Sequence, residues 1–171
     1  MFIASSEENA YRNSHLSSLP VIIRIPNSGR KERIYKIAHA VSIDGVSWTK
    51  VNEGEQVVPD RIGVHEAQAM PSVIQINQTF FLFYCYRDAF DFRTNPSKGY
   101  KIGCVRSENL QDWEPEEIVA ESSSTNEIWD KDMQCYPHVF SWKNRNFIAY
   151  NGNNFGREGF GVAEILVSPK L

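Results

Sequence analysis

The alternation of hydrophobic and polar positions predicts β-strands along most of the chain. Val73–Ile76 and Phe80–Tyr86 are β-branched and aromatic runs separated by the polar pair Asn77-Gln78, a pattern typical of a β-hairpin. Successive residues of the second run point to opposite faces of a strand, and both sets are apolar. A strand that is apolar on both faces is covered on both sides, as in a sheet stacked between two others.

Two segments with this pattern recur at a nearly fixed spacing. Tyr35–Trp48 resembles Tyr100–Trp113, which lies 65 residues further on. Met70–Tyr84 resembles Tyr136–Tyr150, which lies 66 residues further on. Self-similarity at one period indicates a repeat architecture, in which each repeat is one supersecondary unit.

The content of one repeat indicates a β-propeller blade. Further strands are predicted at Lys101–Arg106 and around Trp113, which gives about four antiparallel strands per repeat. No stretch keeps a helical period for three turns. The sequence therefore predicts an all-β fold. We expect a single partial β-propeller domain of about two and a half four-stranded antiparallel blades of a five-bladed type, in units of about 1–59, 60–120 and 121–171.

Polar stretches between the strands are predicted as loops and turns. Glu7–Ser18 is polar where a strand of unit one should follow, and Arg87–Lys98 and Glu114–Asn126 are predicted as long loops. Ser42-x-Asp44-Gly45-x-x-Trp48 is a compact turn signal. Asp can accept hydrogen bonds from the amides of its own turn, and Gly tolerates a positive φ. Asn109 stands at the corresponding place in the second copy, so these residues are expected to close hairpins.

Composition then narrows the class of protein. The 171 residues fit one domain, and 42% hydrophobic and 23% charged residues are ordinary for a globular protein. The net charge of −3 provides no basic field for nucleic acid or an anionic membrane. No apolar run reaches membrane-spanning length, and the N-terminus lacks a signal-peptide pattern. We expect a cytoplasmic protein with no nucleic-acid or membrane partner.

The cysteines and acidic residues give no sign of a disulfide framework or a metal site. Cys85, Cys104 and Cys135 are odd in number and lack C-x-x-C spacing, so reduced, buried thiols are expected. No spacing of His, Asp and Glu argues for a metal, and no cofactor is expected.

Four segments carry a resemblance to a known group of proteins. They are His65–Val73, Phe83–Arg87, Trp129–Pro137 and Tyr150–Arg157, within a likeness that covers Tyr35 to the end of the chain. They resemble the five-bladed β-propeller glycosidases of the arabinanase, xylosidase, invertase and levansucrase types. Within that group the likeness is greatest to an uncharacterised branch linked to bacterial polysaccharide metabolism. The resemblance implies a saccharide or glycan ligand.

The period also implies that the chain holds part of a ring. Five such blades need roughly 300 residues or more, so the chain resembles the C-terminal half of a propeller glycosidase. An open half-ring would expose apolar blade faces, which associate readily. We therefore expect either a homo-oligomer or a partner chain that completes the propeller. The alternative is that the chain is a fragment or a remnant.

The resemblance also implies where catalytic acids should stand. Propeller glycosidases use a general-acid Glu and an Asp base or nucleophile near the ring axis, in several families one or two residues before the Pro that opens a blade. Before Pro71 and Pro137 the corresponding residues are Ala69, Met70, Cys135 and Tyr136. The acids that do recur are Glu66 and Asp132, each five residues before its Pro. Glycoside hydrolysis requires two carboxylates, so these two are the candidate catalytic residues.

Other polar residues near the same segments are candidate saccharide ligands. Gln68 and Gln134 occupy equivalent places, and their amides can bind either sugar hydroxyls or buried backbone groups. Arg87 can hold an anionic group or pair with Asp88 or Asp91. The candidate substrate-binding residues are His65, Gln68, Arg87, Asp130, Gln134, Asn151 and Arg157.

Two kinds of function stay open at this point. A glycoside hydrolase-like enzyme acting on a glycan or sugar conjugate would place Glu66 and Asp132 at one cavity, with carboxyl groups roughly 5–10 Å apart. The alternative is a non-catalytic saccharide-binding or interaction module, or an incomplete half-propeller that needs a partner chain. Fold alone does not choose between them.

Overall fold

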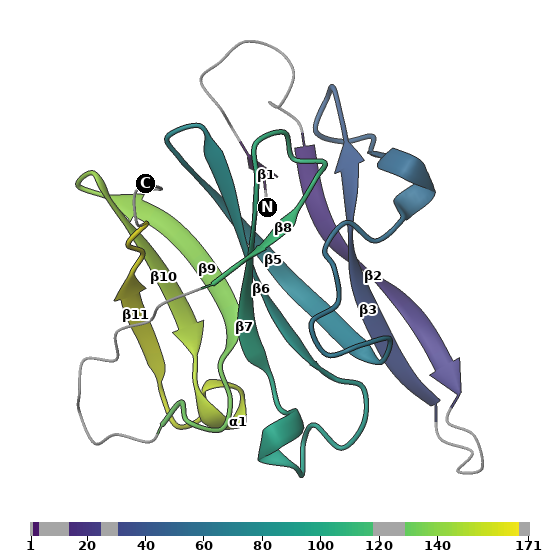
Figure 1. Ribbon diagram of the computed structural model, residues 1–171, viewed down its shortest axis with the longest axis vertical. Helices are drawn as coiled ribbons and strands as arrows, with labels where there is room; N and C mark the ends of the chain where they lie inside the picture. Colours follow the sequence, from purple (N-terminus) through teal and green to yellow (C-terminus); the bar gives the residue numbers. More distant parts are fainter. Residues whose placement is uncertain (1, 4–13, 25–30, 118–128, 168–171) are drawn as a thin grey trace.

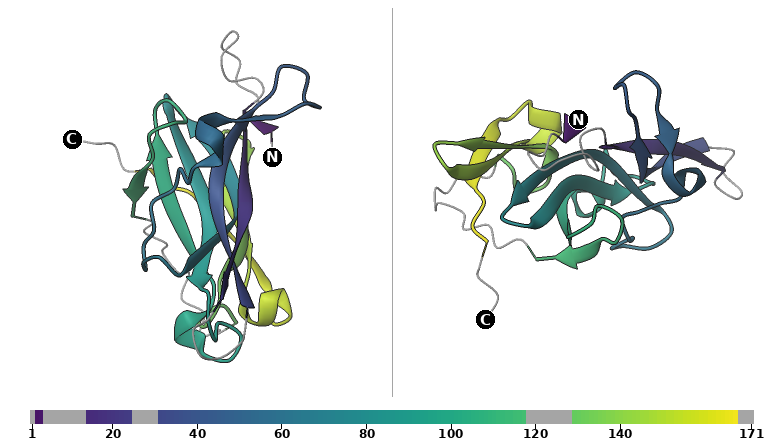
Figure 2. Two further views of the ribbon diagram at one scale, coloured as in Figure 1. Left: turned by 90° about the vertical axis from the view of Figure 1, so that its right-hand side faces the viewer. Right: turned by 90° about the horizontal axis from the view of Figure 1, so that it is seen from above.

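Three antiparallel sheets make up the protein. The computed structural model describes residues 2–3, 14–24, 31–117 and 129–167. The sheets lie side by side in Figure 1 and follow one another in chain order when seen from above in Figure 2. We call them blade one, blade two and blade three. The all-β, partial propeller predicted from the sequence is confirmed.

Each blade runs from an innermost strand outward in chain order. Blade one contains β1 (Phe2–Ile3), β2 (Ser14–Arg24), β3 (Lys31–Val41) and β4 (Thr49–Lys50). Blade two contains β5 (Glu66–Ile76), β6 (Thr79–Asp88), β7 (Lys101–Ser107) and β8 (Glu114–Glu116). Blade three contains β9 (Cys135–Trp142), β10 (Arg145–Asn151) and β11 (Phe160–Glu164). The short helical segments are η1 (Val51–Gly54), η2 (Pro96–Lys98) and α1 (Asn153–Gly156).

Strand β6 is buried on both faces because blade two lies between its neighbours. On one face Phe80, Leu82 and Tyr84 join a core cluster that includes Ile37 and Val58 from the blade-one side. On the other face Phe81 and Phe83 join a second cluster with residues of blade three. The two-sided apolar pattern of the Phe80–Tyr86 run is therefore the signature of a middle blade, and burial of this surface is the main stabilising contribution.

The two equivalent turns close as the sequence predicts. Asp44 Oδ1 accepts hydrogen bonds from the amides of Val46 and Ser47 at 2.8 and 2.7 Å. These bonds hold the pKa of the Asp44 carboxyl far below its ordinary value. In the second copy Asn109 Oδ1 accepts from the amides of the second and third following residues, both at 2.9 Å. The positive φ falls on Gly45 (73°) in one turn and on Leu110 (61°) in the other.

Two of the predicted loops contain strands. Ser14–Ser18 belongs to β2, and Glu114–Glu116 forms β8, so the loop predictions are wrong there. In both cases the backbone ladder of the neighbouring strand extends past the apolar run: Ser14 pairs with Val41, and Glu114 pairs with Arg106. Ladder hydrogen bonds do not require apolar side chains. The rest of those two predicted loops, 7–13 and 118–126, lies almost wholly outside the described residues.

Candidate functional site

The innermost strands of blades two and three have the same kink at equivalent positions. Met70 in β5 and Tyr136 in β9 stand 66 residues apart, each directly before a Pro, and have φ values of 54° and 58°. Bulky residues rarely adopt this left-handed conformation. Met70 is 52% exposed and Tyr136 is 37% exposed. The repeat therefore holds two strained, exposed side chains at one level of neighbouring inner strands.

Tyr136 belongs to a group of aromatic rings near the starts of β7 and β9 and at α1. Its ring stacks on that of Phe155, with centroids 6.4 Å apart and planes 28° apart. Phe155 lies in α1, is 38% exposed and also has a left-handed backbone, with φ of 59°. Both rings approach Tyr100, whose centroid lies 6.1 Å from Tyr136 and 6.0 Å from Phe155. The result is an aromatic surface with one buried and two partly exposed rings.

Glu66 lies in a closed hydrogen-bond network under blade two. Its side chain is fully buried. Oε2 accepts hydrogen bonds from the amides of Arg61 and Ile62 at 2.7 and 2.8 Å, and Oε1 accepts from Gln68 Nε2 at 2.9 Å. Charge-assisted bonds of this kind are short and strong. Glu66 thus fixes the loop that leads into β5.

Gln68 extends the same network toward blade one. Its Nε2 also approaches the Val58 carbonyl at 3.1 Å and Asp60 Oδ1 at 3.2 Å, while its Oε1 accepts a long bond from the Ile37 amide at 3.5 Å. Gln68 is fully buried as well. The Gln68 amide therefore satisfies buried backbone groups, which is one of the two uses expected from the sequence.

Asp132 has different surroundings. It is exposed on the loop before β9 in blade three, where its backbone forms hydrogen bonds. Its amide donates to Asn153 Oδ1 at 3.0 Å, and its carbonyl accepts from Lys101 Nζ at 3.2 Å. The structure brings Glu66 together with Gln68 and a loop on the blade-one side of β5, whereas Asp132 lies in the neighbouring blade.

Gln134 and the Tyr150 hydroxyl meet at the carboxylate of Asp130. Asp130 Oδ2 accepts a hydrogen bond from Tyr150 Oη at 2.8 Å and one from Gln134 Nε2 at 3.4 Å. Burial, and next the bond to Asp130, raise the pKa of Tyr150 to about 12. Tyr150 in turn stacks on Trp129 at 5.6 Å. These polar groups are half-buried and lie two and six residues before Tyr136 in sequence.

Arg87 is buried at the end of β6 in an aromatic setting. Its guanidinium carbon lies 3.6 Å from the centroid of Phe92, a close cation–π contact. Nε donates to Tyr100 Oη at 3.1 Å, and Nη1 donates to the backbone carbonyl of Asp88 at 2.8 Å. The nearby carboxylates of Asp88 and Asp91 approach Lys98. Arg87 therefore supports Tyr100, which underlies the aromatic surface.

The remaining sequence candidates lie at the surface or in the turn after β10. His65 is exposed and meets Phe90 edge-on at 5.2 Å. Arg157 is exposed, and Asn151 Nδ2 makes a long contact of 3.5 Å to the Phe155 carbonyl. Between them Asn153 Oδ1 accepts from the amides of Asp132 and Met133, both at 3.0 Å. This turn therefore ties the loop before β9 to the end of β10.

Two glycines make room for Trp129: Gly152, directly after β10, and Gly161 in β11. A Cβ atom at Gly152 would lie 2.3 Å from the Trp129 ring, and one at Gly161 would lie 2.6 Å from it. Neither distance is tolerated, so both positions require glycine.

The three thiols are free and buried, as predicted. Burial raises the pKa of Cys85 and Cys104 to about 12 and that of Cys135 to about 11. Thiols of this kind stay protonated near neutral pH and are poor nucleophiles. Among the described residues, no group of three or more His, Cys, Asp or Glu side chains is placed to hold a metal ion.

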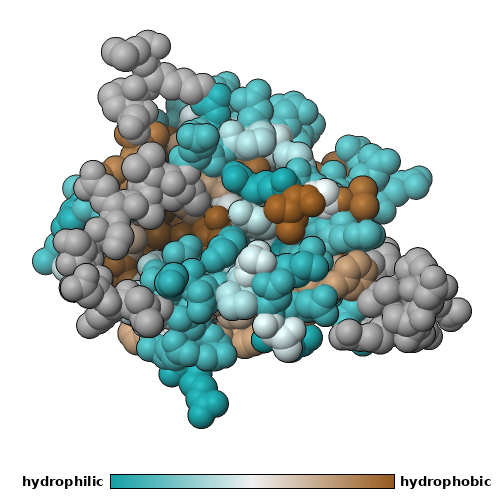
Figure 3. All heavy atoms as spheres, turned by 60° about the horizontal axis from the view of Figure 1, so that its bottom comes forward, coloured by the Kyte–Doolittle hydropathy of each residue, from teal (hydrophilic) through white to brown (hydrophobic). Residues whose placement is uncertain are grey.

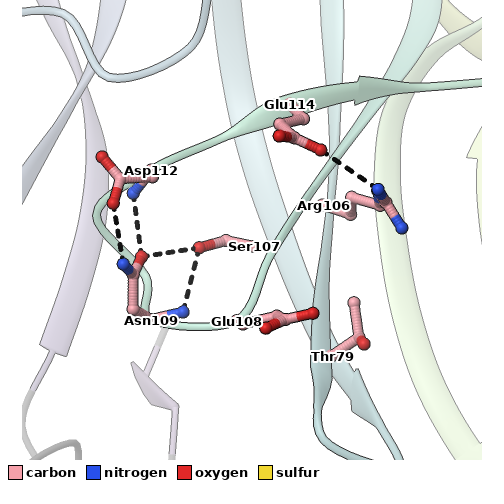
Figure 4. Close-up of a pocket in the computed structure, with 7 residues that line it drawn as sticks. All are labelled: Thr79, Arg106, Ser107, Glu108, Asn109, Asp112 and Glu114. Atoms are coloured by element: carbon pink, nitrogen blue, oxygen red, sulfur yellow. Dashed lines mark hydrogen bonds and ion pairs between the residues drawn. The ribbon is translucent and has the colours of Figure 1, made fainter.

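A polar hollow of about 330 Å³ opens at the other end of blade two. It is lined by Thr79, Arg106, Ser107, Glu108, Asn109, Asp112 and Glu114 (Figure 4). Thr79 pairs with Ile76, at the far end of the β5–β6 hairpin from Glu66. Ser107, Asn109 and Asp112 bond to one another, and Arg106 pairs with Glu114. The hollow is thus separate from the aromatic surface, and the side chains of Ser107, Asn109 and Asp112 form hydrogen bonds within the turn.

Sequence reasoning missed the residues that shape this end of the molecule. In the sequence Met70 and Tyr136 were notable only because no acid stands at those positions. Asn153 and Phe155 lie in a segment predicted as a turn, and no role was predicted for them. Met70 and Tyr136 each precede a Pro, which disfavours the right-handed helical region but favours an extended backbone and does not indicate a positive φ. The sequence therefore held no signal for this conformation.

Comparison with known proteins places this arrangement among propeller folds. No protein-family model matches the chain. Two uncharacterized proteins of Mycobacterium tuberculosis, from strains CDC 1551 and H37Rv, are each 31% identical to it over 136 residues. That match takes in 79% of this chain but only 42% of the relative, so the chain spans less than half the length of the curated relatives it matches.

Several solved structures with a similar fold are glycoside hydrolases. An exo-1,5-α-L-arabinanase from a bovine ruminal metagenomic library aligns over 85% of this chain and 51% of its own, with 13% identity and a TM-score of 0.51. A GH32 β-fructofuranosidase of Bombyx mori aligns over 81% and 27%, with 16% identity and a TM-score of 0.53. A thermostable family-43 glycoside hydrolase aligns over 85% and 48%, with 14% identity and a TM-score of 0.51. The protein is therefore a partial β-propeller of the type found in glycoside hydrolases.

In the part of the chain that the structure describes, no helix has the length and apolar character needed to cross a membrane.

Proposed function

We propose that the chain forms part of the saccharide-binding end of a glycosidase-type propeller, in which these blades supply binding side chains. The observation that carries the proposal is the pair of left-handed residues Met70 and Tyr136, which are exposed at equivalent points of two innermost strands. Tyr136 and Phe155 stack on each other there, and both side chains remain partly exposed. Ligand sites typically combine such apolar faces with a few polar groups, and aromatic faces suit the C–H side of a sugar.

The surroundings of Glu66 argue against a role as acid or base in these blades. A catalytic carboxyl group must come within hydrogen-bond reach of its substrate. Both oxygens of Glu66 accept bonds from protein groups, and the side chain is fully buried. In this proposal the acid and base of a hydrolytic propeller come from blades outside this chain, in a protein of the polysaccharide-metabolising kind.

Titration calorimetry of the full chain tests the proposal. The probes are a 1,5-α-L-arabino-oligosaccharide and a fructo-oligosaccharide, because the structural neighbours include an arabinanase and a β-fructofuranosidase. We expect one of them to bind, with at least tenfold weaker binding by Tyr136→Ala and little change in Tyr136→Phe. Tyr136→Gly removes the ring and relieves the left-handed backbone, so it should lose binding without losing stability.

Two outcomes contradict the proposal. One is the absence of binding to both probes, or an affinity that Tyr136→Ala leaves unchanged. The other is hydrolysis of a probe by the chain alone that disappears in Glu66→Gln, which would restore the enzyme interpretation.

A further inference from the structure

One sheet face of blade two packs toward blade one, and the other packs toward blade three. The apolar residues of the second face have equivalents in blade three. We call the face toward blade three the rear face. In blade two it contains six apolar residues of the core cluster shared with blade three: Ile74, Ile76, Phe81, Phe83, Ile102 and Cys104. Strand register identifies their equivalents in blade three, because Phe81 pairs with Ile74 as Phe147 pairs with Phe140.

The rear face of blade three has the same apolar character, but among the described residues no blade lies against it. Its residues, in the same order, are Phe140, Trp142, Phe147, Ala149, Phe160 and Val162. Phe160 is 75% exposed, Trp142 56% and Val162 55%, whereas Phe83 and Cys104 of blade two are 3% and 1% exposed. In Figure 3 hydrophobic atoms gather on the left, the side on which β9–β11 lie in Figure 1.

This surface is organised as an interface. Phe140 and Phe147 stack at 5.6 Å with planes 23° apart, which gives a flat aromatic centre. The rim is charged: Arg145 pairs with Glu164 and covers the edge of Phe147, and Lys143 lies 4.4 Å from the Trp142 ring centroid. An apolar centre with a polar rim is typical of protein interfaces.

We propose that the rear face of blade three binds the front face of a further propeller blade, carried by polypeptide outside this chain. The front face of blade three shows the chemistry of that partner: an antiparallel sheet presenting residues such as Val139, Ile148 and Ala163. The curated relatives leave room for it, since the 136 matched residues are only 42% of their length. This inference does not depend on saccharide binding.

Addition of one blade to the full chain tests the inference. A second copy of residues 117–167 is fused after Leu171, and amide hydrogen exchange of Phe160–Glu164 is compared with that of the unextended chain. We expect exchange to slow at least tenfold in the extended protein, because docking buries β11. Phe160→Arg in the first copy should abolish the slowing. Ile43→Arg, at a position on blade one that is 97% exposed, is the matched control and should leave it intact.

Two results would overturn the inference. One is unchanged exchange in the extended protein. The other is sedimentation of the unextended chain as a dimer that Phe160→Arg dissociates, since the face would then belong to a second copy. Circular dichroism of unextended Phe160→Arg verifies that the variant folds, as expected at so exposed a position.

Discussion

Blade two and blade three hold the loops before their innermost strands with the same kind of clamp, built from different residues. In blade two Glu66, on the innermost strand, accepts from two successive amides. In blade three Asn153, which follows the second strand, accepts from the successive amides of Asp132 and Met133. Asp132 corresponds to Glu66 in sequence, but in blade three its backbone amide donates to the Asn153 side chain and is one of the groups that are held. Equivalent positions in a repeat can thus exchange the roles of clamp and clamped group.

The largest expected effect separates Glu66 from Asp132. Glu66→Ala leaves the amides of Arg61 and Ile62 without their acceptor, removes one partner of the Gln68 amide and empties a fully buried site. We therefore expect a loss of about 3 kcal/mol or more in the free energy of unfolding. Asp132→Ala should change it by less than about 0.5 kcal/mol, because the side chain is exposed. Urea denaturation measures both. Equal losses in the two variants would show that the two acids have equivalent roles.

A smaller effect is expected from the neutral clamp of blade three. Asn153→Ala removes hydrogen bonds to two amides and one from Nδ2 to Glu158. Neutral hydrogen bonds contribute about 1 kcal/mol each, so we expect a loss of about 2 kcal/mol, less than for Glu66→Ala. A loss in Asn153→Ala that matched or exceeded that in Glu66→Ala would contradict the ranking of charged over neutral clamps.

The smallest expected effect on stability comes from His39 in blade one, and it depends on pH. His39 occupies the place of Cys104, is buried, and within the described chain neither of its ring nitrogens has a hydrogen-bond partner. Burial lowers its pKa from the ordinary 6.5. The folded state therefore favours the neutral ring, and stability should fall as pH drops below about 6.5, where the unfolded state takes up the proton.

The thermal midpoint of unfolding, followed from pH 8 to pH 5 or so, measures this dependence. His39→Leu should flatten that part of the profile, and His65→Leu, at an exposed position, should leave it unchanged. A profile that is identical in the wild type and His39→Leu would exclude His39 as the source.

The fold was predictable because its signals are local and repeated. The two-sided apolar run Phe80–Tyr86 and the Asp44 and Asn109 turns indicate a middle blade and its hairpins without knowledge of distant contacts. The limits of the strands were less predictable, since Ser14–Ser18 and Glu114–Glu116 extend ladders with polar side chains. Their pairing depends on a neighbouring strand, which the segment itself does not encode.

The candidate site was less predictable than the fold. Glu66 and Asp132 share a sequence position, but whether the carboxylate faces solvent or backbone amides depends on how the loop before the innermost strand folds, and the repeat pattern does not specify that. For Gln68 the sequence left two uses open, binding of sugar hydroxyls or of buried backbone groups, and in the structure the amide is buried against backbone groups. The exposed rings of Tyr136 and Phe155 depend on left-handed backbone conformations that no side-chain pattern specifies.

In the turn at Leu110 the energetic cost of the backbone conformation is offset by burial of the side chain. Its left-handed backbone costs a non-glycine residue about 1–2 kcal/mol, a cost that Gly45 avoids in the sister turn. The Leu110 side chain, however, is buried in the core cluster with Trp113, and burial of a leucine contributes about 1.5–3 kcal/mol. Leu110→Gly would therefore remove more stability than it restores. Leucine is the more stabilising residue at this place, and a turn motif written as Asp-Gly describes the first copy of the repeat but does not match Asn109-Leu110 in the second.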